Sequence, residues 1–312
     1  MGKMFIGDAR ELLNNSCFRR YKGEIQLILT SPPFPLNRKK SYGNPSGEDY
    51  LQWLSSMAPI CRDYLKEDGS VIIEIGNAWN AGKPTMSTLP MRSLLAFLEA
   101  GDFNLCQEFI YYNPARLPTP TQWVNIERIR VKDAFTRVWW MSPNERPKGN
   151  NRKILKPYSK SMEDLLKKGT YNSGQRPSEH HIGEKSFLKN NKGAIPPNVL
   201  IPPQSDELAD MNLLCFANTS ANDPYQNYCR NNNIRPHPAR MHPKLAEFFI
   251  EFLTDVGDLV MDPFAGSNTT GSVAERLDRK WLSIELDYIH AKASIARFEK
   301  SKEARKHKRL IR

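Results

Sequence analysis

Short apolar runs alternate with amphipathic stripes in two parts of the chain, residues 1–141 and 237–300. Near-continuous runs, such as residues 25–29 and 71–75, are typical of strands that are buried on both faces of a sheet. Stripes with a spacing of three to four residues, such as Leu245, Phe248 and Phe252, are typical of helices with one face in a core. The alternation of strand and helix predicts a doubly wound α/β sheet.

The pattern also predicts where individual elements lie. We expect strands over residues 3–8, 25–29, 71–75, 105–112, 134–141, 259–262 and 281–284. We expect helices over residues 9–14, 46–66, 89–99, 245–253 and 270–278, and from 288 onward. Pro59 should kink the second helix, and Asp68-Gly69 should form a turn. Trp139 and Trp140 should point to opposite faces of their strand.

Residues 142–236 differ from both regular parts. They are rich in Pro, Asn, Gly, Ser and Lys and show weak periodicity. This composition predicts a loop-rich insertion with a small fold of its own. We therefore expect three regions, residues 1–141, 142–236 and 237–312.

The whole-chain charge favours a polyanionic partner. The 312 residues carry 45 Lys and Arg against 34 Asp and Glu, a formal net charge of +11. Nucleic acid is the first candidate and a membrane surface the second. The length suits one large α/β domain with an insertion.

Other features exclude several classes of protein. The five cysteines are scattered and form no C-x-x-C pair, which argues against a zinc site or a disulfide framework. No apolar stretch approaches the ~18 residues of a transmembrane helix, and no signal peptide is recognisable. We expect a cytoplasmic protein that has no metal and no membrane partner.

The stretch 262–270, Asp-Pro-Phe-Ala-Gly-Ser-Asn-Thr-Thr, predicts a ligand site. It lies between a predicted strand and a predicted helix, which is where open α/β sheets bind ligands. Its small residues allow a ligand to approach the backbone, and the helix start offers free N–H groups. The stretch is neither G-x-G-x-x-G nor a P-loop, so a dinucleotide or a nucleoside triphosphate is disfavoured.

Carboxylates stand at three predicted strand ends, Asp8, Asp262 and Glu285. Any one of them could be a helix cap or a surface charge. In a doubly wound sheet, however, all three could face one crevice. Glu285 follows the glycine-containing turn by about 20 residues, a spacing that suits a ribose diol. Together they favour a nucleoside-type ligand.

A second motif, Thr30-Ser31-Pro32-Pro33-Phe34, follows the predicted strand 25–29. Adjacent prolines stop both sheet and helix, so they predict a stiff loop that presents backbone carbonyls. Phe34 would be held rigidly on this loop. Alone, the motif could be no more than a rigid turn.

With both motifs in view, the chain resembles the S-adenosylmethionine-dependent DNA amino-methyltransferases. Residues 262–270 resemble their cofactor turn, 30–34 their catalytic motif, and 237–244 a further cofactor motif. The catalytic motif precedes the cofactor motif, as in the β class. That class has a circularly permuted class I methyltransferase fold, a Rossmann-like doubly wound mixed sheet. Asn268 stands where many members have glycine, and it should keep the turn because Asn tolerates the left-handed conformation.

The resemblance implies a function for each region. Residues 1–141 would be the catalytic half, 142–236 a target-recognition region, and 237–312 the cofactor-binding half. The implied reaction transfers a methyl group from S-adenosylmethionine to the exocyclic N4 of cytosine in double-stranded DNA. It would proceed by base flipping and direct in-line transfer.

Two alternatives stay open. Serine before Pro-Pro resembles the cytosine-N4 enzymes, but this is a tendency, so adenine N6 remains a rival target. A second alternative is a DNA-binding protein that has the same fold but does not catalyse methyl transfer. The intact residues at Asp262 and 31–34 argue against it.

The resemblance also implies roles for individual residues. The catalytic residues would be Ser31, Pro32, Pro33 and Phe34. The Ser31 hydroxyl and the Pro32 carbonyl would accept the amino hydrogens, and Phe34 would stack on the flipped base. Asp8 would bind the adenine amino group and Glu285 the ribose hydroxyls. The full expected cofactor set is Asp8, Thr30, Arg240, Pro243, Lys244, Asp262, Pro263, Phe264, Ala265, Gly266, Ser267, Asn268, Thr269 and Glu285.

Double-stranded DNA is the expected partner. Arg38, Lys39 and Lys40 would form a clamp that closes over phosphates. The basic stretch 127–160, with Arg128, Arg130 and Lys132, would also contact phosphates, which position a protein without reading sequence. Base readout is expected from the insertion 142–236. The resemblance also implies, as a candidate partner, a cognate restriction endonuclease that shares the recognition site without direct contact.

Overall fold

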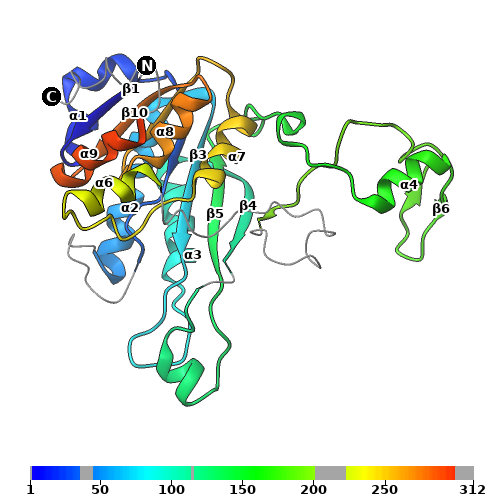
Figure 1. Cartoon of the computed structure of the whole chain (residues 1–312), viewed down its shortest axis with the longest axis horizontal. Coiled ribbons are helices and arrows are strands. Elements are labelled where there is room, and N and C mark those ends of the chain that lie inside the picture. The colour runs from blue at the N-terminus through cyan, green and yellow to red at the C-terminus, as the bar shows by residue number, and fades with distance from the viewer. Residues whose placement is uncertain (1, 36–44, 114–115, 201–222, 299–312) are drawn as a thin grey trace.

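The computed structural model describes residues 2–35, 45–113, 116–200 and 223–298 and is built around one eight-stranded sheet (Figure 1). The strand order is β1-β10-β9-β2-β3-β5-β4-β8. The strands are β1 (Gly2–Ile6), β2 (Ile25–Thr30), β3 (Leu65–Gly76), β4 (Asn104–Tyr112), β5 (Phe135–Ser142), β8 (Val199–Leu200), β9 (Leu259–Asp262) and β10 (Lys280–Glu285).

The first five strands of this order are parallel to one another, and β5 is antiparallel to both of its neighbours. The carboxyl ends of the parallel strands therefore share one edge, here called the carboxyl edge. It is defined by Ile6, Thr30, Gly76, Asp262 and Glu285. The predicted doubly wound mixed sheet is confirmed. Strand β2 lies beside β9 although most of the chain separates them, which is the permuted order expected from the motifs.

Helices cover both faces of the sheet (Figure 1). One face packs against α7 (Pro243–Leu253), α8 (Thr269–Arg276), α9 (Tyr288–Ala293) and the 3-10 helix η4 (Ser294–Phe298). The other face packs against α1 (Ala9–Asn14), η1 (Ser16–Tyr21), α2 (Gly47–Tyr64) and α3 (Leu89–Gly101). Trp139 is buried in one core and Trp140 packs against the other, so their predicted opposite orientation is confirmed.

The predicted turn at Asp68-Gly69 is wrong, because β3 runs through both residues. Ile25 of β2 pairs with Leu65, whereas Leu27 pairs with Ser70, so the extra residues of β3 form an irregularity within the strand. The Gln26 side chain holds it by donating to the Asp68 carbonyl at 3.3 Å and to its carboxylate at 3.2 Å. A local turn signal was overridden by pairing with the neighbouring strand.

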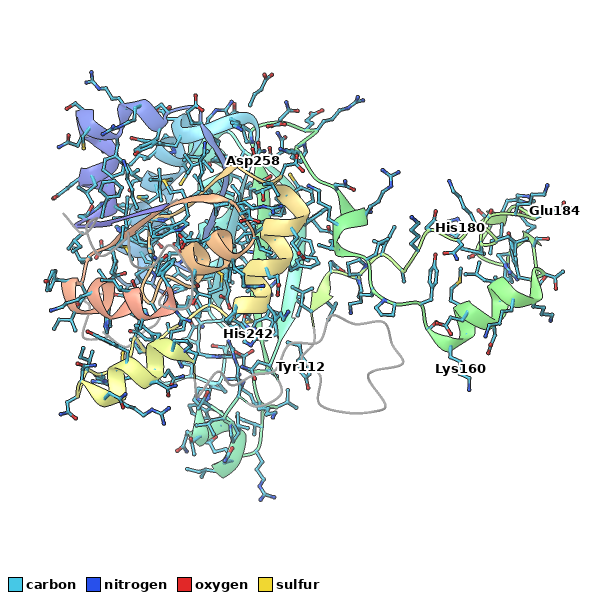
Figure 2. The ribbon with its side chains drawn as sticks, turned by 45° about the horizontal axis from the view of Figure 1, so that its top comes forward. Tyr112, Lys160, His180, Glu184, His242 and Asp258 are labelled. Atoms are coloured by element: carbon cyan, nitrogen blue, oxygen red, sulfur yellow. The ribbon has the colours of Figure 1, made fainter. Side chains whose placement is uncertain are left out.

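The insertion after Ser142 extends away from the sheet, and Figure 2 shows Lys160, His180 and Glu184 together at its far end. Its described elements are η3 (Asn151–Ile154), α4 (Lys160–Lys168), β6 (Gly174–Gln175) and β7 (His181–Ile182), whereas the later helix α6 (Pro224–Asn231) packs on the body against α9 and η4 (Figure 1). The chain returns to the sheet through β8, which pairs in parallel with Ile110 and Tyr111 of β4.

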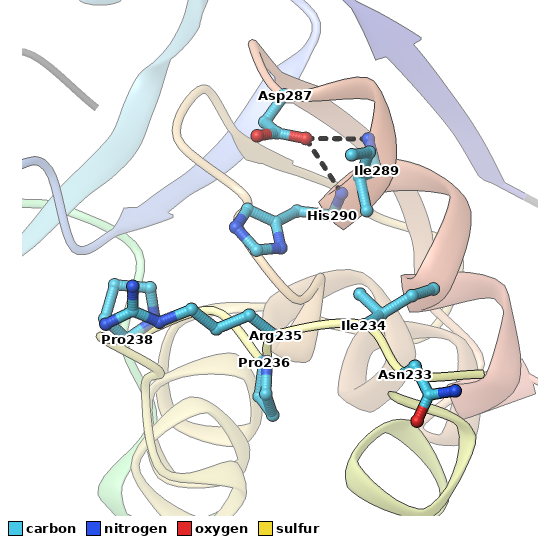
Figure 3. Close-up of a pocket in the computed structure, with 8 residues that line it drawn as sticks. All are labelled: Asn233, Ile234, Arg235, Pro236, Pro238, Asp287, Ile289 and His290. Carbon is cyan, nitrogen blue, oxygen red and sulfur yellow. Dashed lines mark hydrogen bonds between the residues drawn. The ribbon is translucent and has the colours of Figure 1, made fainter. Parts of the chain in front are cut away.

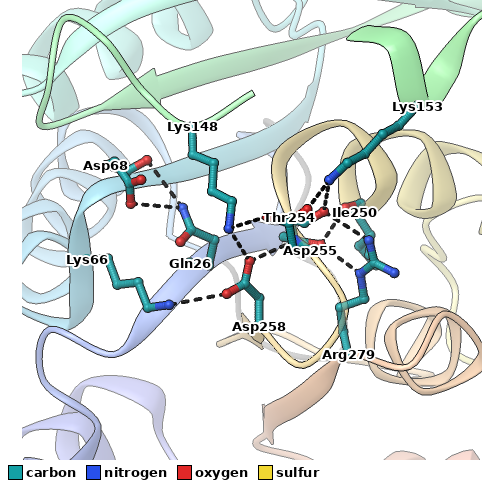
Figure 4. A network of polar contacts seen from close by, with 10 residues as sticks. All are labelled: Gln26, Lys66, Asp68, Lys148, Lys153, Ile250, Thr254, Asp255, Asp258 and Arg279. Atoms are coloured by element: carbon teal, nitrogen blue, oxygen red, sulfur yellow. Dashed lines mark hydrogen bonds and ion pairs between the residues drawn. The ribbon is translucent and has the colours of Figure 1, made fainter. Parts of the chain in front are cut away.

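Ion pairs fasten the start of the insertion to the body of the protein (Figure 4). Lys148 lies 2.7 Å from Asp258 and 2.8 Å from Asp255. Lys66 and Lys153 add further pairs to the same two aspartates. Asp258 precedes β9, so this network lies at the sheet edge opposite the carboxyl edge. Among the described helices, none has the length and apolarity needed to cross a bilayer.

Candidate active site

Asp262 and Thr30 meet at the carboxyl edge because β9 and β2 are neighbours. The Thr30 hydroxyl donates to Asp262 Oδ1 at 2.7 Å, and the Phe264 amide donates to the same oxygen at 3.1 Å. Burial raises the pKa of Asp262 to about 6, against the opposing effect of these hydrogen bonds. The carboxylate is therefore held in place by the loop that follows it.

The loop 263–268 bends sharply before α8. Gly266 and Asn268 have φ angles of 51° and 54°, so both are left-handed. The Asn268 side chain accepts from the Gly271 amide at 3.2 Å and from the Ser283 hydroxyl at 2.7 Å. It caps α8 and ties the loop to β10. The expectation that Asn268 keeps the turn is confirmed.

Glu285 lies on the other side of this loop. Its carboxylate accepts from the Gly266 amide at 2.7 Å and from the Asp287 amide at 2.9 Å. Burial raises the pKa of Glu285. The two backbone amides fix the carboxylate at the end of β10, next to the bend of the cofactor-type loop.

Asp8 follows β1, the strand beside β10, and the Gly7 amide donates to the Glu285 carbonyl at 3.0 Å. Oδ1 of Asp8 caps α1 by accepting from Arg10 and Glu11 at 2.8 and 3.2 Å. The three strand-end carboxylates therefore share the carboxyl edge, and Asp8 also serves as a helix cap.

The catalytic-type loop packs directly on the next strand. The Phe34 ring lies against Gly76, where an added Cβ would come within 2.5 Å of it. Only glycine at the end of β3 allows this ring to lie so close to the backbone. Ser31, at the start of the loop, hydrogen-bonds to Glu74 of the same strand.

Glu74 is a site residue that the sequence analysis missed. It is buried, and the Thr136 hydroxyl donates to it at 3.1 Å. Burial raises the pKa of Glu74 to about 7, while the Thr136 bond, the Arg116 charge and the Ser31 bond oppose that rise. The available signal was a single acid within the apolar run 71–75, since an unpaired buried charge is costly.

Two cavities lie at this edge. A small one is lined by Ser31, His237, Ala239, Arg240, Met241, Asp262, Phe264, Ala265, Gly266, Ser267, Thr269 and Thr270. A larger one of about 480 Å³ is lined by residues 233–236, Pro238, Asp287, Ile289 and His290 (Figure 3). His237 lines the small cavity. The centre of its ring lies 4.9 Å from the centre of the His290 ring, which lines the larger cavity. Burial lowers the pKa of His237 to about 4, so the ring is neutral near pH 7.

Some expected cofactor residues lie elsewhere. Lys244 pairs with Glu247 at 2.6 Å, and neither Lys244 nor Pro243 lines the small cavity, whereas Arg240 does. Pro263 is buried within the loop 263–268. Thr30 and Asn268 are also buried, and their side chains hydrogen-bond to Asp262 and to the Gly271 amide.

The expected DNA contacts fall on two segments of the chain. Arg38, Lys39 and Lys40 lie outside the described residues. Arg128 and Lys132 are exposed between β4 and β5. The Arg130 guanidinium lies 3.1 Å from the centre of the Trp79 ring, so it stacks against the protein surface.

Comparisons with known proteins agree with this geometry. A family model described as DNA methylase, N6_N4_Mtase, matches residues 25–296. The type II methyltransferase M.PvuII of Proteus hauseri is 43% identical over 95% of this chain and 83% of its own length. M.SmaI of Serratia marcescens is 25% identical over 93% of this chain and 88% of its own length.

Solved structures give the same result. The PvuII DNA methyltransferase, titled cytosine-N4-specific, superposes with a TM-score of 0.72 and 36% identity, covering 99% of this chain and 90% of that chain. The M1.HpyAVI–SAM complex shares the fold, with a TM-score of 0.52 and 18% identity over 96% of this chain and 100% of that chain. The order of motifs, the permuted sheet and these matches lead to one conclusion: the chain belongs to the N6/N4 DNA methylase family and has its class I methyltransferase fold.

Proposed function

We propose that this enzyme transfers a methyl group from S-adenosylmethionine to the exocyclic N4 amino group of cytosine in double-stranded DNA. The observation that carries the proposal is the contact between its two motifs. Thr30, which leads into the Ser31–Phe34 loop, is hydrogen-bonded to Asp262 at the head of the cofactor-type loop. A donor methyl and an acceptor base bound at these loops would meet at the ends of two adjacent strands.

The chemistry of the pocket fits S-adenosylmethionine. Glu285 offers a carboxylate to the ribose diol, and Arg240 in the small cavity offers a cation to the amino-acid carboxylate. The left-handed bend at Gly266 turns its amide toward Glu285, which accepts from it at 2.7 Å. Asp262 supplies negative charge beside the sulfonium. When bound, the cofactor supplies an electrophilic methyl group.

Ser31 and Pro32 would orient the target amino group. An exocyclic amino group is a poor nucleophile because its lone pair is delocalised into the ring. The Ser31 hydroxyl donates to Glu74, which leaves its lone pairs to accept one amino hydrogen. The Pro32 carbonyl would accept the other. Positioning of this kind can lower a barrier by ~7–11 kcal/mol in favourable cases.

Phe34 would stack on the extrahelical base. The target atom cannot be reached inside a duplex, so the base must leave the helix. Stacking on an aromatic ring is worth ~1–3 kcal/mol and would offset part of the unstacking cost. Gly76 fixes the Phe34 ring in advance, so little side-chain entropy is lost when a base binds.

The segment 116–133 is the best-placed DNA contact among the described residues. It leaves the sheet after Tyr112 and returns at Phe135, which pair with each other at the carboxyl edge. Asn77 donates to Asp133 at 2.8 Å and so fastens the segment beside Gly76. The insertion, by contrast, starts after Ser142 at the opposite edge. Base readout by the insertion stays a prediction.

Cytosine N4 is favoured over adenine N6 as the target. The matching PvuII structure is titled cytosine-N4-specific and spans nearly the whole chain. The protein named DNA adenine methyltransferase YhdJ, from Escherichia coli, is 38% identical, but over only 20% of this chain and 21% of its own length. Mass spectrometry of nucleosides from DNA treated with the enzyme and cofactor should show N4-methylcytosine. Finding only N6-methyladenine would overturn the target, and finding neither would favour a DNA-binding protein without turnover.

We also propose that the methyl group protects DNA from a cognate endonuclease, since M.PvuII and M.SmaI are named type II methyltransferases. Mapping modified bases on a plasmid would identify the recognition site. An endonuclease that cuts the unmodified site, but not the modified one, would be the expected counterpart.

A further inference from the structure

Arg297, in η4, is buried directly behind the cofactor loop. Its side chain is 7% exposed. Nε donates to the Ser267 carbonyl at 2.6 Å, and Nη2 donates to the Ser267 hydroxyl at 3.0 Å. One guanidinium thus holds the carbonyl and the hydroxyl of Ser267, a residue that lines the small cavity. A buried cation needs a partner charge, because its desolvation is costly.

That partner is Asp223, which is 10% exposed and comes from the end of the insertion. Its Oδ2 lies 3.3 Å from Nη2 of Arg297 and 3.7 Å from Nη1 of Arg240. Two guanidinium groups therefore share one oxygen. The other oxygen, Oδ1, caps α6 by accepting from the Gln226 amide at 2.7 Å. Each oxygen of Asp223 has a separate task.

Tyr225 extends the same connection. The Arg297 guanidinium lies 5.1 Å from the centre of the Tyr225 ring. The Tyr225 hydroxyl accepts from the His237 amide at 3.0 Å. His237 in turn lies against the bend of the cofactor loop, since a Cβ on Gly266 would be 3.1 Å from its ring. The start of α6 thus contacts both segments that line the small cavity.

We propose that Asp223 and Arg297 are positioning residues for the cofactor, an inference that rests on the proposed function. Arg297 sets the Ser267 carbonyl and hydroxyl, and Asp223 balances the buried charge of Arg297 and holds it in place at a fixed spacing from Arg240. The pair lies behind the loop and not at the Ser31–Phe34 motif. Its loss should therefore weaken cofactor binding and leave the methyl-transfer step nearly intact.

The test is calorimetric titration of S-adenosylmethionine and its demethylated product into full-length variants without DNA. Arg297→Lys keeps the charge but cannot form the two-pronged contact with Ser267. Asp223→Asn removes the charge and keeps the α6 cap, because Asn caps as well as Asp. Arg276→Lys is the control, since Arg276 is an exposed arginine on the neighbouring α8 that pairs with Glu247 at 2.8 Å.

We expect both variants to raise the cofactor Kd about 10-fold, because Arg297→Lys loses a charged hydrogen bond to Ser267 and Asp223→Asn loses the charge that is paired with Arg297. The double variant should lose less than the sum, because both changes break one connection. At saturating cofactor, kcat should stay within about twofold of wild type, as expected for lost uniform binding. The control should bind normally.

An unchanged Kd in both variants, or a fall in kcat with unchanged Kd, overturns the inference. If Arg297→Lys does not fold, Asp223→Asn alone decides between these outcomes. Wild-type protein that binds the cofactor but methylates no DNA would refute the proposed function and leave this inference standing.

Discussion

The Thr30 hydroxyl donates a 2.7 Å hydrogen bond to Asp262, a residue 232 positions further along the chain. One partner precedes the catalytic-type loop and the other begins the cofactor loop. The bond exists because β2 and β9 are adjacent strands that end at the same edge. The distance between donor and acceptor loops is therefore fixed by the sheet and needs no separate closing motion of the two motifs.

Ser31→Ala should lower turnover much more than cofactor affinity. The variant removes an acceptor for the amino group but leaves the cofactor loop untouched. We expect kcat to fall about 100-fold or more, the order of a lost acid–base or transition-state contact. Single-turnover rates and calorimetry separate the two effects, with Ser46→Ala as a serine control outside the site. A large rise in cofactor Kd with unchanged turnover would contradict the role of Ser31.

Asp262→Asn should weaken cofactor binding while stabilising the fold. The folded-state pKa of Asp262 is raised to about 6. Its protonated form therefore favours folding, and that contribution is lost as pH rises through about 6. An amide carries no charge, so the variant should melt a few degrees higher than wild type at pH 8. Its cofactor Kd should rise about 10-fold or more. Thermal melts and calorimetry check both, and unaltered binding would count against the pocket.

Glu74 should make the rate of methyl transfer fall at acidic pH, which gives the pH profile of kcat an acidic limb. Its pKa of about 7 means that it is protonated and neutral below that pH, where it is a weaker acceptor for the Ser31 hydroxyl. We expect kcat at saturating substrates to fall as pH drops below about 7. Glu74→Gln should lower kcat and remove that limb. A variant with wild-type pH dependence would exclude Glu74 from the reaction.

The Lys148 network should protect the protein against acid. Hydrogen bonds from Lys148 and then Lys153 lower the pKa of Asp255 to about 2. A lowered carboxylate pKa adds stability above the unfolded pKa, about 4, and this is lost as pH falls toward 2. Lys148→Met should reduce stability at pH 7 and flatten its decline between about pH 4 and 2. Urea denaturation at several pH values measures the free energy of unfolding, with Lys160→Met in the insertion as control. Equal stability of the two variants would show that the network contributes little.

Arg128→Ala should weaken DNA binding uniformly across sequences. Arg128 is exposed on the segment 116–133 at the carboxyl edge. Loss of one phosphate contact lowers the slope of log binding constant against log salt concentration by about one unit. It does not relax sequence specificity. Fluorescence anisotropy over a series of salt concentrations tests this. An unchanged slope would remove the segment from the DNA interface.

The sheet and both motifs could be predicted from sequence because their signals are local. A buried strand requires an apolar run, and a left-handed bend requires residues such as Gly266 and Asn268. The turn predicted at Asp68-Gly69 is wrong for the opposite reason, since pairing of β3 with β2 overrides a local turn preference.

Other features depend on contacts between distant segments. Glu74 lies within an apolar run, and its role depends on Ser31 and Thr136 lying beside it. Such pairings depend on tertiary geometry, which a single sequence does not encode in its spacing.

The permuted sheet also has a consequence during synthesis of the protein on the ribosome. Strand β2 needs β9 as its neighbour, and β1 needs β10, which extends to Glu285. At about 5–20 residues per second, roughly 10–50 s pass between emergence of β2 and of β9. Throughout that time an apolar strand edge is exposed to other chains. We expect nascent chains to depend on chaperones, and refolding yield to fall steeply with protein concentration.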